Sequence, residues 1–181
     1  MKPVVAVLLA IAWSSPAGSQ DEFWVDRDGN PTPDTEARKS VDGFGGWLLV
    51  TPDPDWDEKW RTSPETIPHY NEASTVSIGE TLMTLIFFAN PMVGEDGIVD
   101  VRCDLRVVRP DGSFSVEMTD YECFKGPIQG SPSSIRLSNA LLGFVGEPDD
   151  QRGEWVTEVR LTDMVRSASV ELTTRFELVD D

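Results

Sequence analysis

Apolar and polar residues alternate with a period of two along most of the chain. Between residues 99 and 107 every odd position is apolar and every even position is charged. This alternation is typical of a β-strand with one buried and one solvated face. Cys103 occupies one of the apolar positions, so we expect its side chain to point into the core.

The strand at 99–107 is followed by Arg-Pro-Asp-Gly, which predicts a tight turn because glycine readily adopts positive φ. The chain then returns with a second strand, in which Phe114, Val116 and Met118 are expected to face inward. Simple alternation does not extend to Cys123. We therefore expect a bulge or loop between Met118 and Cys123.

The last part of the chain repeats the pattern as a hairpin around the turn Asp-Met-Val-Arg-Ser. A short loop at this turn predicts three favourable cross-strand pairs: Leu161 with Val170, Val159 with Leu172, and Trp155 with Phe176.

Three further segments are expected to be strands: 46–51, 75–89 with a break near Gly79-Glu80, and a bent strand at 134–144. The Leu-Met-Thr-Leu-Ile-Phe-Phe stretch of the second segment indicates burial on both faces. About seven alternating strands predict an all-β fold, an immunoglobulin-like antiparallel β-sandwich spanning residues 44–181. A short helical turn near 54–61 is the expected exception.

The N-terminus predicts export. Lys2 precedes an apolar run at 4–13, and small residues follow. The run is shorter than the about 20 residues that span a bilayer, so residues 1–19 are interpreted as a secretory signal peptide. Residues 20–43 are rich in Asp, Gly, Pro and Thr, and are expected to form a flexible acidic leader. The product is expected to be soluble, in the periplasm or secreted, without membrane insertion after signal removal.

The charge of the chain limits the classes of partner that it can bind. The chain has 15 Lys and Arg against 32 Asp and Glu, a net charge of −17. Such a surface repels nucleic acid and anionic lipid, so we expect no nucleic-acid partner. We expect a monomer that binds another exported protein or peptide.

Cys103 and Cys123 are the two cysteines, and in an oxidising compartment they are expected to form a disulfide. We expect this disulfide to link the two sheets. Closing a loop of this length would contribute about 3 kcal/mol.

Little in the sequence points to catalysis. His69 is the one histidine, and the sequence has no G-x-S-x-G nucleophile elbow. The many carboxylates make close acidic pairs inevitable, so they carry no specific signal for glycoside hydrolysis. The lack of a Cys/His cluster argues against zinc. We expect a non-enzyme with no catalytic residues, no metal and no cofactor.

The segment 55–70 is the best candidate for a binding site. Trp56 and Trp60 are four residues apart, so one helical turn places both rings on one side. Asp53 or Asp55 could cap that turn. With His69 and Tyr70, the rings could form a platform for a sugar or a peptide. The alternative, which we favour, is that both rings close the open edge of the sandwich between its first and second strands.

Two resemblances bear on fold and location. Asp150, Gly153 and Trp155 resemble the Asp-x-Gly-x-Tyr corner of immunoglobulin-like domains, with Trp in place of Tyr and the Asp one residue further back. The chain also resembles a group of uncharacterised exported proteins of proteobacteria. This second resemblance rests on several pieces: Gly45-Gly46-Trp47, Trp60 with Ser63-Pro64, Phe87-Phe88, Arg109-Pro110-Asp111-Gly112, Cys103 with Cys123, and Gly143-Phe144 through Glu147-Pro148. It implies export and a sandwich fold, and it implies no activity.

These observations lead to three functional hypotheses. The first is a non-catalytic binding or accessory module for another envelope protein, with Trp56, Trp60, His69 and Tyr70 as its binding residues. The second is an inhibitor of an exported protease or other hydrolase, which would present the loop 125–133. The third is a carbohydrate-binding module that uses the two tryptophans.

Overall fold

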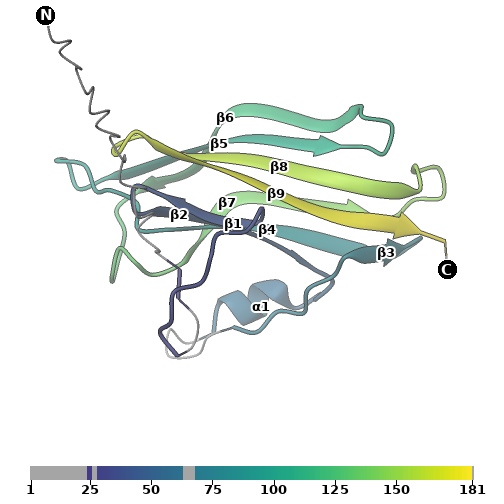
Figure 1. The fold of residues 1–181 in the computed structure, drawn as a ribbon, viewed down its shortest axis with the longest axis horizontal. Coiled ribbons are helices and arrows are strands. Elements are labelled where there is room, and N and C mark those ends of the chain that lie inside the picture. Colours follow the sequence, from purple (N-terminus) through teal and green to yellow (C-terminus); the bar gives the residue numbers. More distant parts are fainter. Residues whose placement is uncertain (1–23, 26–27, 63–67, 181) are drawn as a thin grey trace, which may run out of the picture.

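The computed structural model describes residues 24–25, 28–62 and 68–180, and within them the fold is an immunoglobulin-like β-sandwich of two sheets (Figure 1). The predicted signal peptide lies outside the described residues. No helix in the described chain is long and apolar enough to cross a membrane. The elements are β1 (Arg38–Val41), β2 (Phe44–Thr51), α1 (Trp56–Trp60), β3 (Thr75–Ser77), β4 (Thr81–Ala89), β5 (Val99–Val108), β6 (Phe114–Gly126), β7 (Arg136–Val145), β8 (Gly153–Asp163) and β9 (Ala168–Val179).

The first sheet has the strand order β1-β2-β4-β7, and the second has the order β3-β9-β8-β5-β6. All pairs are antiparallel except β3 with β9. The break predicted near Gly79-Glu80 is the point where the chain crosses between the sheets. Gly79 has φ +84°, a conformation that glycine adopts without strain, so the chain can turn there. The segment expected as one broken strand is therefore two strands in different sheets.

The hairpin of β8 and β9 has the predicted register. Leu161 pairs with Val170, Val159 with Leu172, and Trp155 with Phe176. Trp155 is buried, and its indole Nε1 donates to the carbonyl of Gln151 at 3.0 Å. This bond to the backbone four residues upstream is the role that the tyrosine hydroxyl has in the corner of immunoglobulin-like domains. The resemblance noted in the sequence thus has a structural counterpart.

The core between the sheets follows from the alternation. In β5 the side chains of Val99, Val101, Cys103 and Leu105 are almost fully buried, as predicted. Strand β2 lies against β9 at Gly46, where an added Cβ would be 2.7 Å from Cγ2 of Val170. A side chain at this position would separate the two sheets.

Strand β6 departs from the predicted pattern. Its register with β5 shifts three times, because β6 uses thirteen residues where β5 uses ten. One shift falls between Met118 and Tyr121, which confirms the predicted bulge, and Asp120 there has φ 52°. Phe114 and Met118 were expected to face the core, but both are exposed. The register shift between Phe114 and Val116 turns Phe114 outward beneath the Arg106 guanidinium. Met118 lies on β6, the last strand of its sheet.

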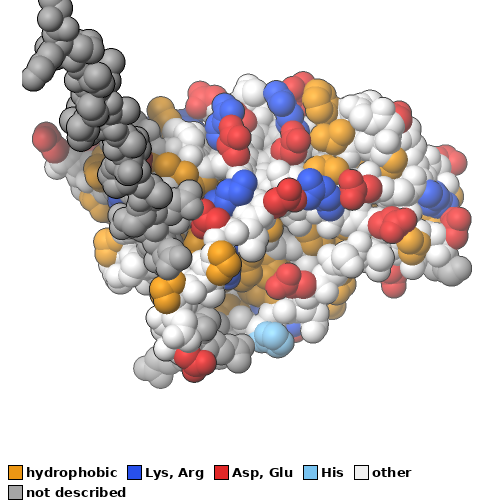
Figure 2. Space-filling view, viewed as in Figure 1, with side chains coloured by type: hydrophobic (Ala, Val, Ile, Leu, Met, Phe, Trp, Pro, Cys, Tyr) orange, Lys and Arg blue, Asp and Glu red, His pale blue; other side chains and the backbone are white. Residues whose placement is uncertain are grey.

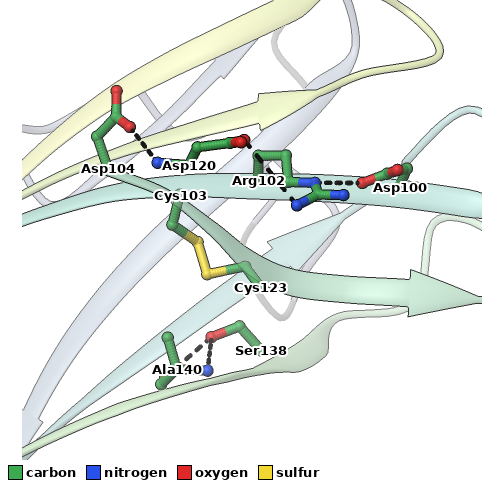
Figure 3. Close-up of a disulfide and its surroundings, with 8 residues drawn as sticks. All are labelled: Asp100, Arg102, Cys103, Asp104, Asp120, Cys123, Ser138 and Ala140. Carbon is green, nitrogen blue, oxygen red and sulfur yellow. Dashed lines mark hydrogen bonds and ion pairs between the residues drawn. A yellow bond between two sulfur atoms is a disulfide. The ribbon is translucent and has the colours of Figure 1, made fainter. Parts of the chain in front are cut away.

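The disulfide joins Cys103 of β5 to Cys123 of β6, with the two Cα atoms 5.7 Å apart (Figure 3). Both residues are buried. The expectation that the disulfide links the two sheets was wrong, because the disulfide joins neighbouring strands of one sheet. The bulge beside it is held by Asp104, which accepts a hydrogen bond from the backbone N–H of Asp120 at 3.0 Å (Figure 3).

The segment 20–43 is not a flexible leader throughout its length. Its residues 38–41 form β1, which pairs with β2 at the edge of the first sheet. Upstream, Trp24 is buried, and its carbonyl accepts a hydrogen bond from the Thr32 N–H at 2.8 Å. The boundary expected at residue 44 therefore falls inside the sheet, because β1 is too short to show alternation.

One end of the sandwich is tied together by a buried carboxylate, Asp163. Its oxygens accept backbone hydrogen bonds from Met92 at 2.7 Å and from Val165 and Arg166 at 3.0 Å each. The Arg166 guanidinium in turn donates to the carbonyls of Asp42 and Asn90. Three loops distant in sequence are thereby joined at one point.

Candidate functional site

The segment that contains α1 covers the outer face of the first sheet (Figure 1). Because Leu85 and Phe87 of β4 and Leu49 of β2 point away from the main core, this face needs a cover, and they form a separate apolar cluster with Tyr70. The predicted burial of β4 on both faces is confirmed. Trp56 and Trp60 pack against this cluster.

Phe87 lies at the centre of the aromatic rings on this face. Its ring centroid lies 5.2 Å from that of Trp47, 5.4 Å from that of Trp60 and 6.3 Å from that of Tyr70. Trp56 and Trp60 are half-buried in this arrangement. They close an outer face of the sheet, whereas the favoured interpretation from sequence placed them at the open edge between strands. We call Trp47, Trp56, Trp60, Tyr70 and Phe87 the aromatic cover.

Asp53 anchors this segment. Asp55 occupies the position before the helix but makes no capping hydrogen bond with its side chain. The buried Asp53 instead accepts hydrogen bonds from Lys59 Nζ at 2.7 Å and from the backbone and side-chain nitrogens of Asn71 at 2.9 and 2.7 Å. Burial raises the pKa of the Asp53 carboxyl. The bonds from Lys59 and Asn71 lower it by more, so that its pKa lies well below the usual range.

The structure brings together three of the four predicted binding residues. Trp56, Trp60 and Tyr70 lie around Phe87, and the Tyr70 hydroxyl donates to the carbonyl of Trp56 at 3.4 Å. Burial raises the pKa of Tyr70. His69 is exposed. Packing accounts for the three aromatic positions, and their role in binding a ligand stays a prediction.

The loop proposed for an inhibitor, 125–133, is braced from within by Arg136. The guanidinium donates to four carbonyl oxygens of the connection between β6 and β7, those of Gln129, Ser131, Pro132 and Ser134, at 2.6–3.0 Å. Burial lowers the pKa of Arg136. These four bonds tie residues 129–134 of the connection together.

The outer face of the second sheet is highly charged. Figure 2 shows basic and acidic side chains interspersed across the face in view. Arg160 bonds Glu171 at 2.6 Å, and Arg106 lies 3.4 Å from Glu117. A depression of about 270 Å³ lies among Asp104, Arg106, Glu158, Arg160 and Glu171. Among the described residues, no group of three or more His, Cys, Asp or Glu side chains is arranged to hold a metal ion.

Sequence reasoning missed the flank formed by β6, β7 and their connection. Six large apolar side chains on it are exposed: Phe114, Met118, Tyr121, Ile135, Leu141 and Val145. We call this set the β6/β7 flank. Alternation in the sequence marks Phe114 and Met118 as core positions, and only the strand order shows that β6 and β7 are the last strands of their sheets.

Comparison with known proteins adds little beyond this description. No protein-family model and no curated protein matches the sequence. Solved structures are similar at low identity. A Pyrococcus furiosus CARDB domain in complex with di-metal ions has a TM-score of 0.38 and 8% identity, over 82% of this chain and 100% of that one. The PKD domain of an M14-like peptidase from a Thermoplasmatales archaeon has a TM-score of 0.31 and 12% identity, over 59% of this chain and 86% of that one, and a Pseudomonas fluorescens alkylpurine DNA glycosylase bound to DNA containing an abasic site analog has a TM-score of 0.39 and 12% identity, over 72% of this chain and 29% of that one. The chain spans less than a third of that glycosylase. At these TM-scores the likenesses carry no argument about function.

Proposed function

We propose that the chain is an exported, non-catalytic binding module that contacts another protein of the bacterial envelope through the β6/β7 flank. The observation that carries the proposal is that six large apolar side chains are exposed along the two edge strands β6 and β7 and the loop between them. Exposed apolar side chains along an edge without a neighbouring strand in the described chain are typical of an interaction surface.

The disulfide supports an oxidising compartment outside the cytosol. The flank is a better contact surface than the aromatic cover, because Trp56 and Trp60 already use part of their area against Phe87. A partner on the flank would bury side chains that now face water. That burial would contribute about 25 cal/mol for each Å² of apolar surface removed from water.

The proposal is tested by site-specific photocrosslinking in the native host. A photoreactive phenylalanine analogue replaces Met118, Ile135 or Leu141 on the flank, and Val41 or Met164 at the end of the sandwich serve as exposed controls. We expect one common crosslinked protein from the flank positions and none from the controls. Equal crosslinking from all five positions, or none from the flank, would contradict the proposal.

The same experiment with Trp56→Ala and Trp60→Ala separates the flank from the aromatic cover. We expect the crosslinked product to persist, because the cover lies on the outer face of the first sheet. Its loss in a variant that remains folded would instead support Trp56, Trp60, His69 and Tyr70 as the binding residues.

A second candidate function, inhibition of an exported protease or other hydrolase, is favoured by one observation. The four carbonyl bonds of Arg136 tie part of the loop 125–133 together, and such pre-organisation lowers the entropy lost when a loop enters an active site. Incubation with a panel of exported proteases tests it. Inhibition without cleavage is expected of an inhibitor, and rapid cutting within the loop without inhibition dismisses the candidate.

A further inference from the structure

The two sheets end in four edge strands, and three of these carry features that oppose pairing with another chain. Strands β1 and β3 are four and three residues long, and short edges offer few backbone groups to a partner. Strand β6 is long, but its three register shifts and the exposed acids Glu117, Asp120 and Glu122 interrupt it. Bulges and charges of this kind protect edges against strand addition.

The second half of strand β7 lacks these protections. The strand has ten residues, and from 137 to 145 it contains no charged residue. Over 141–145 it pairs with β4 in regular register, and the one irregularity lies opposite Ile86, nearer its start. The far side of β7 has no neighbouring strand in the described part of the chain. In an antiparallel strand about half of the backbone N–H and C=O groups point toward each side, so a row of them faces away from β4.

We propose that β7 accepts an extended segment of a partner protein as an additional strand of the first sheet. This inference rests on the proposed function and assigns its contact to one strand. Backbone hydrogen bonds along 141–145 would supply the affinity, and alternate side chains would supply the specificity. Leu141 and Val145, which are 39% and 51% exposed, lie on the outer face of the sheet beside the added strand.

The inner side of the added strand would also meet apolar groups. Leu142 and Phe144 of β7 are half-buried and pack in one cluster with Val116 of β6. A strand laid beside β7 would extend this cluster, because alternate residues of the new strand point toward the second sheet. The central residues of the partner segment are therefore expected to be apolar or uncharged.

Charge identifies the flanks of the partner segment. Glu147 and Asp149, which directly follow β7, are both exposed. Glu117 and Glu122 of β6 already lie beside Arg106 and Arg102 of β5. Arg136, the one basic residue of β7, is occupied by the loop carbonyls. Lysine or arginine residues next to the apolar centre would be complementary to Glu147 and Asp149. A second copy of the chain is a poorer fit, because each copy carries a net charge of −17.

Hydrogen exchange with a designed probe tests the inference. The probe is the amidated peptide Lys-Lys-Thr-Val-Thr-Val-Thr-Val-Lys-Lys, together with versions in which Leu, Ile or Phe replaces Val. We expect saturable binding that slows the exchange of alternate amides within 141–145. A version with alternate backbone amides N-methylated keeps the charges and side chains but cannot complete the ladder, so it should not protect these amides.

Two variants of the full-length chain locate the contact. Leu141→Lys with Val145→Lys adds two charges to the edge, and we expect binding of the probe to weaken at least about tenfold. Val41→Lys with Val165→Lys adds the same charge at two exposed valines away from β7 and should leave most of the binding intact. Equal weakening in both variants would show a general charge effect and overturn the assignment to β7.

The remaining outcomes also decide the question. Failure of every probe to protect 141–145, or equal binding of the N-methylated version, would overturn strand addition. A glutamate-flanked probe that binds as well as the lysine-flanked one would contradict the assigned charge. Protection of β7 without probe, together with dimers in analytical ultracentrifugation, would assign the edge to a second copy. If crosslinks from Met118 and Ile135 persist while no probe binds, the result supports the proposed function and contradicts strand addition.

Discussion

Replacing Asp53 with asparagine is expected to loosen the aromatic cover and lower the stability of the protein. The substitution keeps the size of the side chain but removes its charge. Asp53 is 6% exposed and accepts three hydrogen bonds, one of them from the Lys59 ammonium. An asparagine can accept only with its oxygen, so Lys59 or Asn71 would lose its partner.

The magnitude follows from the bonds that are lost. A hydrogen bond to a charged group contributes about 1.5–3 kcal/mol, and a buried donor left without a partner adds a penalty of similar size. We expect Asp53→Asn to lower the free energy of unfolding by about 2–4 kcal/mol. Asp55→Asn is the matched control, since Asp55 contacts the same ammonium at 3.1 Å but is 49% exposed. That change should cost under about 1 kcal/mol.

Urea unfolding monitored by tryptophan fluorescence measures both variants. Hydrogen exchange adds a local readout, because the Asn71 and Ala73 amides, bonded to Asp53 and to the carbonyl of Val50, should exchange faster in Asp53→Asn. Equal losses in the two variants, or unchanged exchange at Asn71, would refute the reasoning.

The pH dependence gives a second check with a defined sign. The pKa of Asp53 is depressed in the folded protein relative to about 3.9 in an unfolded chain. The ionised group therefore contributes its full stabilisation above about pH 4, and this contribution is lost as the pH falls toward the folded pKa. The stability difference between the wild type and Asp53→Asn should be constant near neutral pH and shrink below about pH 4. A difference that grows on acidification would contradict the assignment.

Three further predictions concern the sandwich itself. Asp163→Ala leaves three backbone N–H groups and the Arg166 guanidinium without their carboxylate. It should lower the free energy of unfolding in urea by about 3–5 kcal/mol. A loss below about 1 kcal/mol would show that Asp163 does not hold these loops together. Reduction of the Cys103–Cys123 bond should lower the free energy of unfolding by about 3 kcal/mol, measured as a lower urea midpoint. The far-UV circular dichroism under native conditions should stay unchanged. Gly46→Ala should cost about 1–3 kcal/mol in thermal unfolding, because its Cβ would meet Val170 at 2.7 Å, and an unchanged melting temperature would show that β9 can move away.

Much of the fold could be read from local patterns. The burial of β5 and the register of β8 with β9 followed from alternation and a short loop, because side chains of a strand point to opposite faces in turn. The partner of Cys103 followed from composition, since only one other cysteine is present. The bulge before Cys123 was visible as a failure of the alternation.

Other features were not accessible in this way. Phe114 and Met118 have the spacing of core residues, yet register shifts and the open edge of β6 leave both exposed. The aromatic rings of 56–70 were recognised as a cover, but the surface they cover was misplaced. The pattern of β4 shows that both of its faces are apolar, and does not show which segment packs on the outer one.

By itself, the amino-acid sequence determined which residues alternate, where turns fall and which cysteines can pair, since these depend on chain neighbours and on composition. Only the tertiary structure decided which strands are edges, that the disulfide lies within one sheet, and that β7 is the long edge without bulges or charge along 141–145. These properties depend on which distant segments lie beside a strand, and a strand with two neighbours can have the same local pattern as a strand with one.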